Sequence, residues 1–128
     1  MVLTGLTTHR WCSFPSYAAV SEDAVTVPAG GFATIPFPIS GQTEAGGELV
    51  LYVNDSFDVP ASVLDYLCWG TGGTMRKTTA ESADKWSGAC ADAIPTGGAL
   101  HRGQDEEGDV GGDYNANGTQ TPMNCIAP

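Results

Sequence analysis

Two neighbouring stretches, Gly47–Tyr52 (GELVLY) and Val63–Gly70 (VLDYLCWG), decide the fold of this chain. Both are short and rich in aliphatic and aromatic residues, and a polar connection with Asn, Asp and Pro separates them, so they predict two adjacent β-strands. Side chains alternate between the two faces of a strand, which puts Leu64, Tyr66 and Cys68 together. The charge of Asp65 on the other face makes this the predicted core face. Both strands are apolar enough for the middle of a β-sandwich.

The composition fits one all-β domain over residues 1–128. Seventeen Gly and eight Pro predict many turns, and no stretch keeps a helical period. Further short strands are expected at Val25–Val27, within Pro95–Arg102 and at Phe32–Ile39. Pro36 and Pro38 in the last of these cannot donate ladder hydrogen bonds, which indicates an edge strand. No apolar run is long enough to span a bilayer, so membrane insertion is not expected.

Charge narrows the class of partner. Fifteen acidic residues against five basic ones give a net charge of −10. This charge repels nucleic-acid phosphates and anionic membranes, so neither is an expected partner. It equally suits a protein that is merely kept in solution by its surface, or one that meets cations in an extracellular setting.

The cysteines indicate an oxidising compartment. There are four, Cys12, Cys68, Cys90 and Cys125, and none forms a C-x-x-C pair. An even number in an acidic chain with few lysines favours two disulfides and an extracellular, periplasmic or cell-surface location. Of the three possible pairings we expect Cys12–Cys68 across the core and Cys90–Cys125 at the C-terminal loops. Buried free thiols are the alternative.

The region after the last strand is acidic and rich in glycine. Residues 103–120 lack a core-forming pattern and are predicted to be a long loop. Within it, DYNANG at 113–118 matches the opening of a calcium loop, in which oxygens at alternate positions converge on one ion. The candidate ligands are Asp109, Asp113, Asn115, Asn117 and Thr119. The twelfth position is Asn124 instead of a bidentate Glu, and a solvated acidic turn is the alternative interpretation.

Several motifs together resemble the lamin-tail-like domains of secreted bacterial proteins. They are WC-x-FP-x-Y at 11–17, GEL-x-LY at 47–52 and LDYL-x-WG at 64–70, with weaker matches at Trp86–Gly88, Gly98–Leu100 and Thr121–Asn124. The resemblance covers most of the chain and implies an immunoglobulin-like antiparallel β-sandwich of about seven strands. The resemblance also implies a first strand before this segment, which we expect to be missing from residues 1–128, and Gly5-Leu6 stands where Gly-Trp is common. The family has no single activity, so the resemblance transfers no catalytic residue.

Enzyme chemistry has little support in the sequence. His9 and His101 each adjoin an arginine and belong to no Ser-His-Asp or paired-carboxylate pattern. Trp11 and Tyr17 could form an aromatic platform for a sugar, although such residues more often pack in a core. We expect a non-enzymatic structural, assembly or accessory subunit that contacts other protein chains, itself included. The alternative is a calcium-dependent module that binds carbohydrate or protein.

Overall fold

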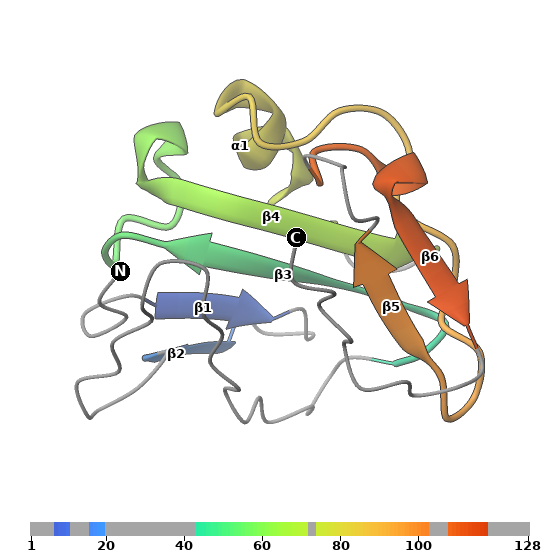
Figure 1. Ribbon diagram of the computed structural model, residues 1–128. Coiled ribbons are helices and arrows are strands. Elements are labelled where there is room, and N and C mark those ends of the chain that lie inside the picture. Colours follow the sequence, from blue (N-terminus) through green and yellow to red (C-terminus); the bar gives the residue numbers. More distant parts are fainter. Residues whose placement is uncertain (1–6, 11–15, 20–42, 72–73, 103–107, 118–128) are drawn as a thin grey trace, which may run out of the picture.

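The described part of the chain is mostly β-strand, arranged in two antiparallel sheets (Figure 1). This computed structural model describes residues 7–10, 16–19, 43–71, 74–102 and 108–117. The larger sheet has the order β2-β1-β3-β4, and β5 pairs with β6 in the smaller one. The strands are β1 (Thr7–Arg10), β2 (Ser16–Ala19), β3 (Gly46–Tyr52), β4 (Val63–Gly70), β5 (Ala99–Arg102) and β6 (Tyr114–Asn117). The all-β prediction is therefore confirmed at the level of strand content.

Strands β3 and β4 are the predicted central pair, and their bounds agree with the sequence pattern. Their register contains a β-bulge: Leu51 lies opposite Asp65, but Tyr52 lies opposite Val63, so Leu64 is the extra residue. The bulge moves Val63 to the core face in place of Leu64, which is 37% exposed. The prediction of the core face is thus right for Tyr66 and Cys68, which are buried, and wrong for Leu64.

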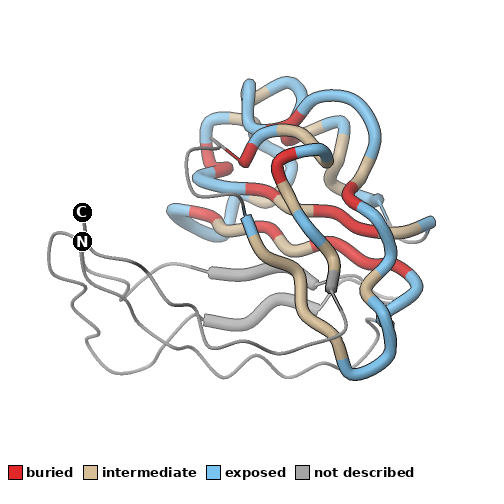
Figure 2. The backbone as a smooth tube through the Cα atoms, turned by 45° about the vertical axis from the view of Figure 1, so that its right-hand side comes forward, coloured by how far each residue is buried: buried red, intermediate tan, exposed pale blue. Residues whose placement is uncertain are grey.

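The core lies between the β3–β4 pair and the segment that follows β4. Val50, Tyr52 and Tyr66 are buried on the sheet side, while Ala80 and Trp86 close the core from the other side. Ala80 belongs to helix α1 (Lys77–Ser82), and the Trp86 ring meets the Tyr66 ring edge-on with centroids 5.4 Å apart. Figure 2 shows the buried positions running along the central strands and recurring in the covering segments. The described core is therefore built by a sheet and the connection between β4 and β5.

One disulfide ties this connection to the sheet. Cys68 of β4 is bonded to Cys90, and beside the bond the Ala91 N–H donates to the Cys68 carbonyl at 2.9 Å. Both predicted pairings, Cys12–Cys68 and Cys90–Cys125, are therefore wrong, because Cys68 and Cys90 bond each other. Cys12 and Cys125 lie outside the described residues. The cysteine pair is consistent with an oxidising environment.

The predicted acidic loop at 103–120 is partly regular structure. A 3-10 turn, η2 (Gly111–Asp113), leads directly into β6, whose Asn115 lies opposite His101 of β5. The prediction of an unstructured loop is therefore wrong for residues 111–117. A second 3-10 turn, η1 (Pro60–Ser62), leads into β4.

The remaining strand predictions, at 25–27 and 32–39, fall outside the described residues. In the part of the chain that is described there are six strands, and no helix in it combines the length and hydropathy needed to cross a bilayer.

Candidate functional site

A charged cleft of about 450 Å³ opens beside the bulged start of β4. Leu51 and Leu64 form its apolar part. Around them stand three carboxylates and two cations, contributed by Asp65, Asp84, Asp109, Lys85 and Arg102. The described lining is therefore mainly charged, unlike the mostly apolar lining of typical small-molecule pockets.

The end of α1 places two of these charges. Asp84 has φ +54°, and its N–H donates to the Glu81 carbonyl, while the Lys85 N–H donates to the Ala80 carbonyl. These two bonds make a Schellman motif, in which the left-handed position is usually glycine. Aspartate tolerates this conformation better than most residues. The motif ends the helix and directs Asp84 and Lys85 to the cleft wall.

Asp65 is the carboxylate contributed by the sheet. Its Oδ1 accepts the Tyr66 backbone N–H at 2.9 Å. Asp65 is exposed, yet the nearby protein desolvates its carboxylate enough to raise the pKa of Asp65. The Tyr66 hydrogen bond and the charges of Arg102 and Lys85 act in the opposite direction and do not offset the desolvation. Asp65 is thus a carboxylate whose charge the fold only partly compensates.

The remaining wall comes from β5 and the turn before η2. Gly108 has φ +84°, and its carbonyl accepts the Tyr114 hydroxyl at 3.1 Å. A Cβ at Gly108 would stand 2.7 Å from Arg102 Cδ and 2.8 Å from the Tyr114 hydroxyl, so glycine suits this positive φ and spares both side chains a shift. Burial, followed by the nearby Asp65 charge, raises the pKa of Tyr114 to about 12. Tyr114 therefore stays a neutral donor at physiological pH.

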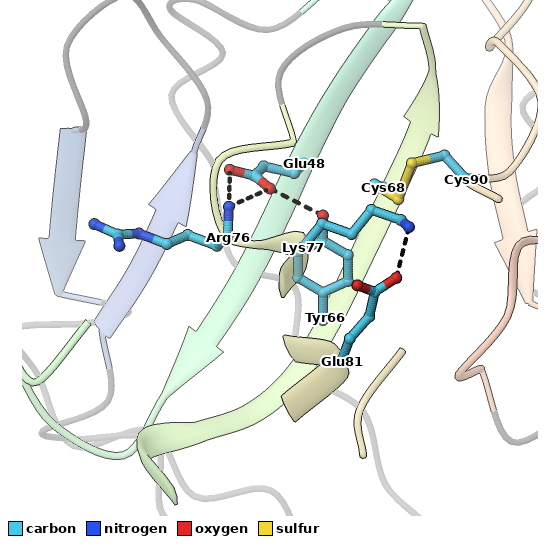
Figure 3. Close-up of a disulfide and its surroundings, with 7 residues drawn as sticks. All are labelled: Glu48, Tyr66, Cys68, Arg76, Lys77, Glu81 and Cys90. Carbon is cyan, nitrogen blue, oxygen red and sulfur yellow. Dashed lines mark hydrogen bonds and ion pairs between the residues drawn. A yellow bond between two sulfur atoms is a disulfide. The ribbon is translucent and has the colours of Figure 1, made fainter. Parts of the chain in front are cut away.

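A second polar constellation, around Glu48, lies inside the core (Figure 3). The Glu48 side chain is fully buried, and its Oε2 accepts the Tyr66 hydroxyl at 2.9 Å. The Arg76 backbone N–H, just before α1, points at both carboxylate oxygens, 3.1 and 3.2 Å away. Burial and the Glu48 charge raise the pKa of Tyr66, which keeps its hydroxyl protonated. This network joins β3, β4 and α1, and we assign it to stability.

The structure describes the side chains of three predicted calcium ligands, Asp109, Asp113 and Asn115. Asp113 is buried, and its Oδ2 accepts the backbone N–H groups of Gly108 and Asp109 at 2.9 and 3.2 Å. Asn115 and Asn117 lie in β6, where alternate residues are about 6.8 Å apart. Thr119 lies outside the described residues. Within the described ranges no three His, Cys, Asp or Glu side chains are grouped as metal ligands.

The other candidates are dispersed. His9 lies in β1 opposite Val50 and Tyr17, and Tyr17 lies in β2; Trp11 falls outside the described residues. His101 faces Asn115 across the small sheet, and its Nε2 is buried without a hydrogen bond to any described residue. The sequence had one signal for the cleft, the single charge of Asp65 within an apolar strand. Nothing in the spacing of Asp84, Lys85 or Arg102 indicated that they meet there.

Comparisons of this chain with models of protein families, with curated proteins and with solved structures gave no match.

Proposed function

We propose that this chain is a non-enzymatic extracellular assembly or accessory module that contacts partner chains, including copies of itself, through the edges of its strands. We further propose that it is a lamin-tail-like, immunoglobulin-like β-sandwich, because its motifs at 11–17, 47–52 and 64–70 resemble those of that family. The observation that carries the assembly role is the ribbon formed by β5 and β6. Within the described residues this ribbon pairs with no other strand along its outer edges.

Unpaired edges matter because each exposes a row of N–H and C=O groups that a strand from another chain can pair with. A two-stranded antiparallel ribbon is also only marginally stable without further packing. The outer edge of β4 differs, because the segment around Ala91 covers part of it. There the Gly70 N–H donates to the Ala91 carbonyl. The ribbon is therefore the better place for an added strand.

The setting follows from the covalent chemistry and the charge. The Cys68–Cys90 bond supports an oxidising compartment, and an extracellular location is the simplest one for a small disulfide-bonded β module. The net charge of −10 argues against nucleic acid and anionic membranes as partners. The calcium-dependent alternative has less support, because two backbone N–H groups already donate to Oδ2 of Asp113.

Molar mass by light scattering, across a micromolar concentration series, tests the proposal. We expect a mass above that of one chain, rising with concentration. Asn115→Lys, which puts a charge on the exposed β6 position, should lower that mass because charges on an edge strand oppose pairing. The matched control is Thr96→Lys, the same charge change at an exposed turn outside the strands. A single-chain mass at every concentration would refute self-assembly, and equal effects of the two variants would refute the ribbon as the contact.

A further inference from the structure

Three aromatic rings form a row that runs from the core toward the surface. The Trp86 ring meets the Tyr66 ring with centroids 5.4 Å apart, and the Tyr114 ring lies on its other contact, with centroids 6.1 Å apart and planes tilted by 32°. Tyr66 and Trp86 are 1% and 2% exposed, whereas Tyr114 is only half-buried. These separations are those of aromatic pairs in contact, so an oxidant that meets the Tyr114 ring can draw an electron from the buried rings behind it.

The two buried rings differ in where a proton can go. The Trp86 Nε1–H is buried without a hydrogen bond to any described residue. The Tyr66 hydroxyl donates to Glu48 Oε2 at 2.9 Å, and the Glu48 side chain is fully buried (Figure 3). Loss of an electron makes an indole N–H or a phenol O–H strongly acidic. An oxidised Tyr66 therefore has a base beside it inside the core, whereas an oxidised Trp86 keeps its proton.

Buried charge decides which of the two rings remains oxidised. An electron lost from Trp86 leaves two charges in the core, the indole radical cation and the Glu48 carboxylate. Buried charges cost free energy even when they attract each other. If Tyr66 supplies the electron and its proton moves to Glu48, the core holds a neutral tyrosyl radical and a neutral carboxylic acid. Burial therefore favours Tyr66 as the end point of the oxidation.

We propose that this row conducts oxidising equivalents: a one-electron oxidant at the surface is reduced by Trp86, and Tyr66 then re-reduces Trp86. In the second step one electron passes from Tyr66 to the indole radical cation. The O–H bond of Tyr66 breaks, and an O–H bond forms at Glu48 Oε2. Because the Tyr66 ring is enclosed, its radical cannot couple with a tyrosine of another chain. The inference goes beyond the proposed assembly role and does not depend on it.

The test oxidises the full, disulfide-bonded chain with light-generated ruthenium(III) tris(bipyridine) and follows the radicals by transient absorption. We expect a tryptophan radical that decays while a tyrosyl radical rises, with a slower rise in heavy water because the Tyr66 proton moves with the electron. Tyr66→Phe should remove most of this rise and prolong the tryptophan radical. Tyr114→Phe deletes a hydroxyl whose acceptor is the Gly108 carbonyl, a much weaker base than a carboxylate, and should leave the rise in place. Trp86→Phe should lower the yield of the Tyr66 radical.

Each contrary result overturns the inference. The same rate of rise in ordinary and heavy water would exclude proton transfer to Glu48 without relying on any variant. An equal tyrosyl yield in Tyr66→Phe would exclude Tyr66 as the end point, and an equal yield in Trp86→Phe would exclude the path through the indole. The proposed function is judged separately, because the Asn115→Lys comparison by light scattering involves none of these rings.

Discussion

Removing the Tyr66 hydroxyl tests whether the buried Glu48 network stabilises the fold. Tyr66→Phe deletes one oxygen whose partner is Glu48 Oε2, 2.9 Å away, and both residues are buried. The carboxylate then keeps the Arg76 N–H and loses the hydroxyl. Tyr114→Phe deletes the same atom where the acceptor is the neutral Gly108 carbonyl, 3.1 Å away and partly buried, and so serves as the matched control.

The expected magnitudes differ because the acceptors differ. A hydrogen bond to a charged group contributes about 1.5–3 kcal/mol and a neutral one about 0.5–1.5 kcal/mol. We therefore expect Tyr66→Phe to cost about 2 kcal/mol and the control about 1 kcal/mol. With an unfolding entropy of about 2.1 cal/mol/K per residue over 128 residues, about 2 kcal/mol corresponds to a fall in Tm of about 7 °C.

Urea unfolding at pH 7 with the disulfide intact measures these free energies, and a thermal scan gives the Tm. Equal losses in the two variants would contradict the assignment of Glu48 as a charged, buried acceptor. A loss below about 0.5 kcal/mol in Tyr66→Phe would contradict the contact itself.

Three further predictions concern other parts of the fold. A non-reducing digest should give a linked peptide pair containing Cys68 and Cys90, and replacing both by Ala should cost about 3 kcal/mol from the loop of 22 residues that the bond closes; any other partner for Cys68 would refute the topology. Gly70→Ala should lower the free energy of unfolding, measured in urea, more than Gly97→Ala does. Both glycines have positive φ, but the new methyl group at Gly70 would stand 1.8 Å from a backbone oxygen. At Gly97 no heavy atom lies within 4 Å of the new methyl group. Asp65→Asn should raise the Tm at pH 7. Because the pKa of Asp65 is raised in the folded state, protonated Asp65 contributes stability below the ordinary pKa of 3.8. This contribution is lost as pH rises through the folded pKa. The stability advantage of Asn over Asp should therefore vanish at pH 3.

Local pattern was sufficient for the central strands. The alternation of β3 and β4 predicted both elements and placed Tyr66 and Cys68 on the core face. The error at Leu64 arose from one inserted residue, because a bulge exchanges the faces on either side of it and no residue type in this strand marks its position. The burial of Glu48 also left no local signal, since its cost is met by partners 18 and 28 residues away.

Contacts between segments that are far apart in the chain could not be predicted from the sequence. The disulfide depends on how the chain after α1 returns along β4, which four cysteine positions alone do not determine. The cleft likewise combines a bulge, an aspartate in the left-handed position after a helix and the end of β5. The roles of Asp113 and Asn115 were also not evident from the acidic motif, because Asp113 accepts backbone N–H groups of its own turn while Asn115 belongs to a strand.

The Cys68–Cys90 bond also determines how the molecule would carry mechanical tension. A pull on the two chain ends passes from β4 directly through the sulfur atoms, so the residues between them, α1 included, bear no load. At about 3.4 Å per residue, the 22-residue separation would store about 75 Å of contour length that stretching cannot release. Reduction of the disulfide would release this length, so the extensibility of the chain depends on whether its surroundings are oxidising or reducing.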